Sequence, residues 1–250
     1  MVVRVTLLGR PAIEVDGRRW EPAADQRSAL MYYLASAGGW VPRDDLLALF
    51  WPDRPEHKAR AALRQLLART AKQPFAAALE VERTRVRWDV STDADALVSA
   101  GPTHATWPGS FLDGFRIPSA PEFDDWLALE RSAWEGRWRV WALRTATDAL
   151  AGDRAEHARE VLDAWLLQDP FDEAAFRAWC EASLRLGRRA ATAQRYQAFE
   201  ATLRSELGVD PQPATRTAAV GDGAASDSAG PTRTTPHTAP PTADAPRWRT

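Results

Sequence analysis

Two hairpin-like stretches enclose three helix-like stretches in the first 90 residues, and this order constrains the fold more than any other feature of the chain. Residues 2–8 and 12–20 predict strands around Asp16-Gly17, because Asp-Gly between apolar stretches favours a tight hairpin turn. Residues 79–90 alternate between apolar and charged side chains. This alternation predicts a second hairpin, with its turn near residues 83–85.

Between the two hairpins, apolar residues recur at helical spacing and predict three helices. The first covers residues 24–37 and ends at Gly38-Gly39, and the second covers residues 43–51. The third runs from about Pro55 to Gln73, before Pro74 breaks the helical pattern. One face of this third helix is apolar, and the opposite face carries His57, Lys58, Arg60, Arg64, Gln65, Arg69 and Lys72.

Positive charge is concentrated on the third helix and the hairpin that follows it. Residues 54–87 hold nine Lys and Arg against three Asp and Glu, a net of +6, although the whole chain has a net charge of −2. The charged helix face alone is equally typical of a solvated amphipathic helix. The basic hairpin tip beside it favours DNA, because hairpin, three helices and hairpin is the plan of a winged helix whose third helix enters the major groove.

Helical periodicity returns at Pro121 and continues to about Leu207. It predicts four helices, over residues 122–150, 154–167, 171–186 and 188–206. A weak repeat of glycine, arginine and alanine recurs at a period of 35, close to the period of tetratricopeptide-type helix pairs, in which small residues let adjacent helices approach. The recurring positions are Gly152, Arg154, Ala155 and Ala158, followed by Gly187, Arg189, Ala190 and Ala193. The predicted fold class is therefore mainly α with small antiparallel β hairpins: a winged helix followed by an α-helical, tetratricopeptide-like repeat domain.

Four regions follow from these patterns. Residues 1–92 are predicted as the winged-helix domain, residues 93–120 as a connector packed on the core, and residues 121–211 as the repeat domain. Residues 91–211 hold 13 Lys and Arg against 20 Asp and Glu, so this part is acidic where the first is basic. Residues 212–250 contain almost nothing to bury, so this tail is predicted to be disordered.

The sequence offers no pattern for catalysis. His57, His104, His157 and His237 lack metal-ligand spacing to one another and to Cys180, which lies on an apolar helical face and is expected to be an inert core thiol. No phosphate-binding or nucleophile-elbow motif occurs. We therefore expect no enzymatic activity, no cofactor and no metal. A single cysteine, no signal peptide and no apolar run of membrane length predict a cytoplasmic protein without membrane contact.

Several segments, in a fixed order from about Val3 to Pro211, carry a resemblance to a known family. They are VTLLGRPAIEVDGR, ALMYYLASAGGWVPRDDLLALFWPD and KARAALRQLLAR in the first half, then FLDGF, EFDDWLALER, LLQDPFDEAAFR and ELGVDPQPAT. In this combination the chain resembles the antibiotic regulatory proteins with a bacterial transcriptional activator domain (SARP-type). The resemblance implies an OmpR/PhoB-like winged helix followed by a tetratricopeptide-like activator domain.

The resemblance also implies a role and a set of contacts. The winged helix would bind double-stranded promoter DNA, as a homodimer or in several copies, and the second domain would contact RNA polymerase. The residues that match the polar positions of the family's ARxxLRQxLxR pattern, and are expected to face DNA, are Arg60, Arg64, Gln65 and Arg69. The residues expected to contact phosphates are Lys58 and Lys72 on the helix, and Arg83 and Arg85 on the wing.

Three positions of the third helix depart from the family pattern. Ala62 stands where many relatives have Asn, Ala68 where many have Ser, and Thr70-Ala71-Lys72 replaces a Leu-Arg-Arg run. These changes remove base-reading groups, so phosphate contacts are expected to supply most of the affinity. An alternative function is a tetratricopeptide-type protein-interaction adaptor whose winged helix no longer recognises DNA. A sensor with a ligand in the repeat groove is a third possibility.

Overall fold

The N-terminal residues form a four-stranded sheet in the order β3-β2-β1-β7. β1 (Val3–Thr6) pairs antiparallel with β2 (Ala12–Val15), which pairs antiparallel with β3 (Arg18–Trp20). Asp16 and Gly17 join β2 to β3 with φ angles of 47° and 83°, a left-handed backbone that both residue types tolerate. The predicted hairpin at Asp16-Gly17 is therefore confirmed.

Three helices follow this sheet: α1 (Gln26–Ala37), α2 (Arg43–Phe50) and α3 (Glu56–Thr70). Helix α1 contacts β7 of the sheet on one side and α3 on the other. Asp25 caps α1, because its carboxylate accepts hydrogen bonds from two backbone amides of the first turn while Ser28 accepts one from the Asp25 amide. Gly38 ends α1 in a left-handed conformation. The apolar face of α3 is buried as predicted, through Ala59, Leu63, Leu66 and Leu67.

A second sheet, in the order β4-β6-β5, forms the wing. It consists of β4 (Val41–Pro42), β5 (Leu79–Val81) and β6 (Arg85–Trp88), and a short 3-10 helix, η1 (Pro74–Ala78), links it to α3. Val86 and Trp88 are buried, whereas Arg85 is exposed. The predicted alternation and the turn before Arg85 are confirmed, and the first lobe has the winged-helix arrangement.

The connector contains regular structure that the sequence patterns do not predict. β7 (Ser91–Thr92) pairs parallel with β1, and α4 (Asp93–Ala100) follows it directly. The carboxylate of Asp93 accepts hydrogen bonds from the backbone amides of Leu7 and Leu8, at 2.7 and 3.1 Å. A two-residue strand has no measurable period, so only its pairing with β1 reveals it.

Residues 107–120 pass along the first lobe and reach the long helix. Their backbone forms hydrogen bonds with Leu7 and Gly9, just after β1, and a β-bridge joins Leu8 to Phe111. The two backbones lie so close at Gly9 that a Cβ there would be 2.7 Å from the carbonyl oxygen of Pro108. Arg131 then donates hydrogen bonds to three carbonyls between Phe111 and Phe115, at 2.7 to 3.1 Å. These bonds fix the connector between the sheet and the helix that carries Arg131.

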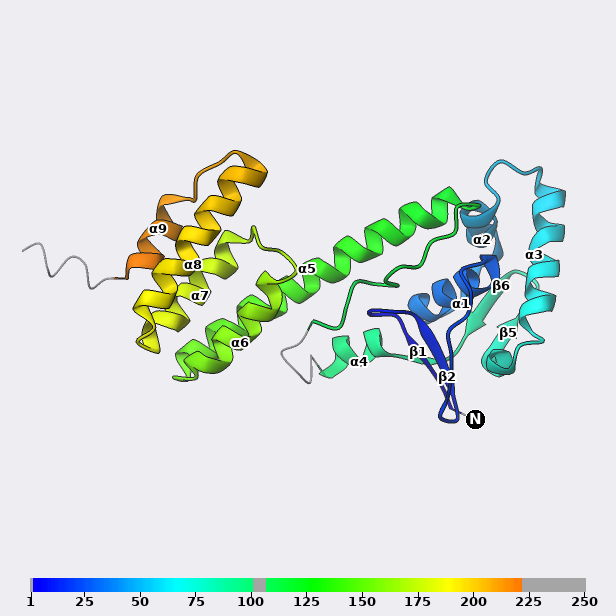
Figure 1. Cartoon of the computed structure of the whole chain (residues 1–250). Helices are drawn as coiled ribbons and strands as arrows, with labels where there is room; N and C mark the ends of the chain where they lie inside the picture. The colour runs from blue at the N-terminus through cyan, green and yellow to red at the C-terminus, as the bar shows by residue number, and fades with distance from the viewer. Residues whose placement is uncertain (1, 101–106, 222–250) are drawn as a thin grey trace, which may run out of the picture.

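The computed structural model describes residues 2–100 and 107–221, and its second half is helical (Figure 1). The helices are α5 (Pro121–Ala151), α6 (Ala155–Leu166), α7 (Glu173–Arg185), α8 (Arg189–Thr202), the π-helical turn η2 (Leu203–Leu207) and α9 (Pro213–Val220). Figure 1 shows α5 running from the winged-helix lobe into the bundle of α6 to α9. At 31 residues, α5 is about 46 Å long.

Two hydrophobic cores share helix α5. Its first half contributes Phe123, Leu127 and Trp134 to the core of the winged helix, although the sequence patterns assign residues from 121 onwards to the second domain. Its second half contributes Trp138 and Ala142 to the core of the helical bundle. The same helix therefore belongs to both lobes.

Helix α9 corrects one prediction. The tail predicted from residue 212 begins instead with Pro213–Val220 in a helix, in which Thr215 and Ala219 are buried. Its neighbours include Arg177 of α7, whose guanidinium donates to the hydroxyl of Thr215 at 3.2 Å. Two small buried side chains are enough to hold this helix in place because it packs against α7. The rest of the predicted tail, residues 222–250, lies outside the described residues.

Candidate nucleic-acid interface

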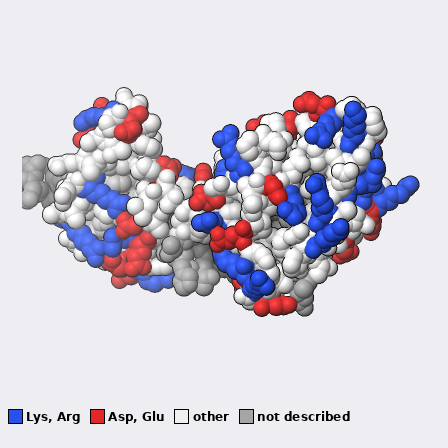
Figure 2. All heavy atoms as spheres, turned by 45° about the vertical axis from the view of Figure 1, so that its right-hand side comes forward, with Lys and Arg blue, Asp and Glu red and all other residues white. Residues whose placement is uncertain are grey.

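All eight residues that the sequence singles out for DNA have exposed side chains. They are Lys58, Arg60, Arg64, Gln65, Arg69 and Lys72 on and just after α3, and Arg83 and Arg85 on the wing. Because the apolar face of α3 packs into the core, the opposite face is left open to solvent. Figure 2 shows many Lys and Arg side chains on the lobe that carries α3.

Ion pairing divides the cations of the α3 region into two kinds. Arg60 is held by two carboxylates, with Nε 2.8 Å from Glu56 and Nη2 3.1 Å from Asp44 of α2. Within residues 2–100 and 107–221, no ion pair joins the other four cations to an acidic group. Those four, Lys58, Arg64, Arg69 and Lys72, keep their full charge for an external anion.

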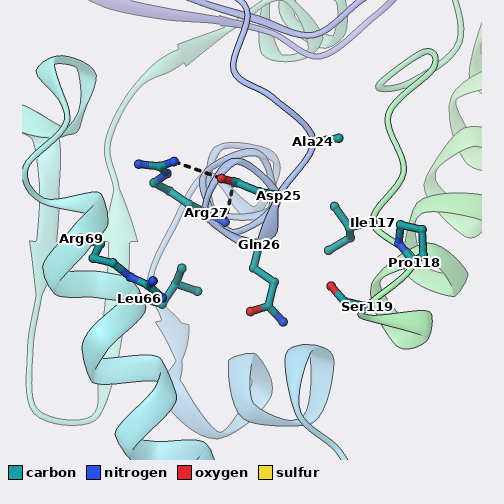
Figure 3. Close-up of a pocket in the computed structure, with 9 residues that line it drawn as sticks. All are labelled: Ala24, Asp25, Gln26, Arg27, Leu66, Arg69, Ile117, Pro118 and Ser119. Carbon is teal, nitrogen blue, oxygen red and sulfur yellow. Dashed lines mark hydrogen bonds and ion pairs between the residues drawn. The ribbon is translucent and has the colours of Figure 1, made fainter.

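Arg69 lies at the edge of an open pocket of about 540 Å³, between the start of α1, helix α3 and residues 117–119 (Figure 3). Across the pocket edge, Arg27 pairs with Asp25 at 3.0 Å. Arg69 therefore lies on the side of α3 that faces the connector, and not only on the exposed side that carries Arg64 and Gln65.

The tip of the wing is tied to the start of α2. The backbone amide of Glu82 donates to the carbonyl of Arg85 and closes the turn, and the amide of Arg43 donates to the carbonyl of Thr84, both at 2.9 Å. Arg85 donates two hydrogen bonds to the Glu82 carboxylate, at 2.7 and 3.3 Å. These bonds lower the pKa of Glu82, so the carboxylate is ionised and offsets the charge of Arg85.

Two residues of the wing region, Trp40 and Arg87, are not among the eight that the sequence predicts. The guanidinium carbons of Arg85 and Arg87 lie 4.2 and 4.9 Å from the ring centre of Trp40, close enough for cation–π attraction. Arg87 shares the alternation of Arg83 and Arg85, so this pattern could have identified it. Trp40 could not be found locally, because its place beside Arg87 depends on the pairing of β4 with β6.

The chemistry of the remaining candidate groups is limited. Cys180 is fully buried, and burial raises its pKa to about 12, which fits an unreactive core thiol. Among the described residues, no three His, Cys, Asp or Glu side chains come together as ligands for a metal ion. No helix in the same part of the chain combines the length and apolarity needed to cross a membrane.

Comparisons with known proteins agree with this arrangement. A solved structure of Mycobacterium tuberculosis EmbR in complex with a low affinity phosphopeptide has the same fold, with a TM-score of 0.60 and 18% sequence identity. The likeness covers 87% of this chain and 64% of that one, so this chain spans less than two thirds of the length of that structure. Among curated proteins, none matches the chain. The family model of the bacterial transcriptional activator domain matches residues 73–219, more than half of the chain, and the chain therefore belongs to that family.

Proposed function

We propose that this member of a transcriptional regulator family binds double-stranded promoter DNA through α3 and the β5–β6 wing. The proposal depends chiefly on one observation: four cations on the exposed side of the α3 region have no acidic partner among the described residues. Surface cations without partners favour a polyanion, since binding releases the counterions that the phosphates had condensed. A winged helix offers such a helix to the major groove and its wing to the adjacent backbone.

The contacts are expected to divide by position. Arg64 and Gln65 lie on the exposed middle of α3, where side chains can reach base edges; Arg is suited to guanine and Gln to adenine. Lys58 and Lys72 near the helix ends, and Arg83 at the wing tip, are expected to bind phosphates. Arg60 contributes less, because Glu56 and Asp44 already occupy its guanidinium.

The salt dependence of DNA binding tests this proposal. The purified chain is titrated, by fluorescence anisotropy, with a labelled duplex from upstream of its own gene at several salt concentrations. Three to four unpaired cations on phosphates would give log K against log salt a slope of about −3 to −4. Arg64→Ala is expected to weaken binding by about 1–3 kcal/mol and to reduce the preference among sequences. Arg144→Ala, an exposed arginine on α5, is the matched control and should bind like the wild type.

A failure to bind any duplex at about 50 mM salt contradicts the proposal. A stable protein partner together with flat DNA titrations would instead favour the adaptor function. We propose further that the chain binds DNA as two copies and that the helical bundle contacts RNA polymerase. Pull-down of RNA polymerase by the wild-type chain, compared with a chain truncated after α5, tests the second part.

A further inference from the structure

On one face of the wing sheet, Arg85 and Arg87 each pair with a glutamate and also lie over the indole ring of Trp40. In the register of the sheet, Glu80 of β5 lies opposite Arg87 of β6, and Val41 of β4 lies opposite Val86. Trp40, one residue before Val41, therefore continues the row of Glu80 and Arg87. Glu82 and Arg85 form the neighbouring row near the wing tip.

The two glutamates neutralise most of the wing in the free protein. Arg87 Nη2 lies 2.6 Å from Glu80, and Arg85 makes a two-point contact with Glu82. Residues 80–87 therefore have a net charge of only +1, despite three arginines. About half of each glutamate side chain is exposed, at 47 and 48%, so these pairs are open to solvent and to a competing anion.

A guanidinium group can contact an aromatic ring and a hydrogen-bond acceptor at the same time, and the acceptor can be exchanged without loss of the ring contact. Its flat face stacks on an aromatic ring, whereas its edge donates the hydrogen bonds. The guanidinium carbons of Arg85 and Arg87 lie over the ring of Trp40, and their nitrogens donate hydrogen bonds to Glu82 and Glu80. A phosphate matches the same edge as a carboxylate, so it can replace the glutamate while the arginine stays on the ring.

We propose that Glu80 and Glu82 compete with DNA for the wing arginines, and that Trp40 is the positioning residue that keeps both guanidinium groups at the wing surface during the exchange. This inference depends on the proposed DNA binding. In the free protein the carboxylates hold Arg87 and Arg85, and in the complex the phosphates take their places. The glutamates thus lower the affinity of the wing for single anions. A DNA backbone supplies several adjacent phosphates, which are enough to displace both carboxylates.

Charge-neutral variants of the glutamates test the competition. Glu82→Gln and Glu80→Gln keep the size of the side chain and remove its charge, so DNA binding is expected to tighten roughly two- to fivefold for each, the range that an exposed ion pair is worth. Glu181→Gln is the matched control. It breaks the same kind of pair, with Arg185 at 2.6 Å, but on α7 of the helical bundle, and should leave DNA affinity unchanged.

Two variants of Trp40 separate positioning from packing. Trp40→Leu keeps an apolar side chain but removes the aromatic face, and is expected to weaken DNA binding roughly two- to fivefold. It should also make the salt slope shallower by about 0.9 for each phosphate that the wing no longer binds. Trp40→Phe, which restores an aromatic face, should recover most of the affinity and the slope. Thermal melting of each variant verifies that it is folded.

The outcomes distinguish this inference from the proposed function. If the wild type binds DNA but the glutamine variants bind equally or more weakly, the glutamates do not compete and the inference is overturned alone. If both Trp40 variants keep the wild-type salt slope, Trp40 does not position the arginines. If the wild type binds no DNA, the inference and the proposed function are both wrong.

Discussion

A single buried carboxylate, that of Asp172, joins three helices of the second lobe. It accepts two hydrogen bonds from Arg139 of α5, at 2.6 and 3.0 Å, and one from the indole of Trp165 in α6, at 2.8 Å. It also caps α7 by accepting from the amides of Ala174 and Ala175. Burial opposes its ionisation, but the hydrogen bonds from Arg139 and Trp165 hold its pKa below the ordinary value of 3.8.

Replacing this carboxylate should be costly. Asp172→Ala is expected to lower the free energy of unfolding by about 2–4 kcal/mol, because the helix cap is lost and the donors of Arg139 and Trp165 lose their acceptor. Since the pKa is lower in the folded state, the stabilisation is fully present above pH 3.8 and is lost as the pH falls through the folded pKa. Urea unfolding at about pH 7 and below about pH 4 measures both effects. Asp172→Asn, which keeps one acceptor, should lose less, and an equal loss would contradict the assignment of the cap.

The sequence predicts which cations are exposed on α3 and the wing, but it does not predict which of them are already paired, and this difference has a physical reason. Charge and helical spacing are local, so the exposed cations of α3 and the wing could be predicted from neighbouring residues. The partners of Arg60 and Arg85 depend on tertiary contacts with Asp44 and Trp40. No periodicity encodes such contacts, and they determine which of the predicted cations remain available.

Among the elements, α5 has an unusual residue in its interior. Gly136 is exposed between Trp134, which belongs to the first core, and Trp138, which belongs to the second. A Cβ added at Gly136 would meet no atom within 4 Å, so a larger side chain fits without movement. The cost of glycine inside a helix is its greater freedom in the unfolded chain.

Gly136→Ala is therefore expected to raise the free energy of unfolding by about 0.5–1 kcal/mol. Gly114→Ala is the matched contrast: it also faces open space, but its φ of 71° is left-handed and strains an alanine, so it should destabilise. Chemical denaturation of both variants measures the two signs. A loss of stability in Gly136→Ala would mean that the bend or flexibility of α5 at this residue matters to the fold.

Elements with a clear period could be predicted, and those without one could not. The helices from α1 to α3 and from α5 to α8 lie close to the predicted ranges, because each buries an apolar stripe. By contrast, β7 has two residues and α9 buries only Thr215 and Ala219. Both are stabilised by a partner distant in the sequence, β1 and α7 respectively, so a local pattern contains too little information to place them.

For the whole molecule, the shared helix α5 makes the stability of the two lobes interdependent. Its first half cannot leave the winged-helix core without exposing Phe123 and Leu127, and its second half supports α6 and α7 through Ala142 and Ala146. Helix formation is cooperative along one segment, so order in each half favours order in the other. The wild type is therefore expected to unfold in a single transition, with circular dichroism and tryptophan fluorescence coincident.

Gly136→Pro should uncouple the lobes. Proline at this position removes a helical hydrogen bond and clashes with the preceding turn, at a cost of about 3 kcal/mol, while each core keeps its own packing. We expect two separate unfolding transitions in urea, with the lobe that carries α3 still able to bind DNA. Gly136→Ala, at the same position, should keep the single transition. If Gly136→Pro also unfolds in one step with an unchanged denaturant slope, the lobes are coupled through the connector, whose Trp107 packs on Trp138 and Trp165 of the second core. Trp107→Ala in the proline variant should then separate the two transitions.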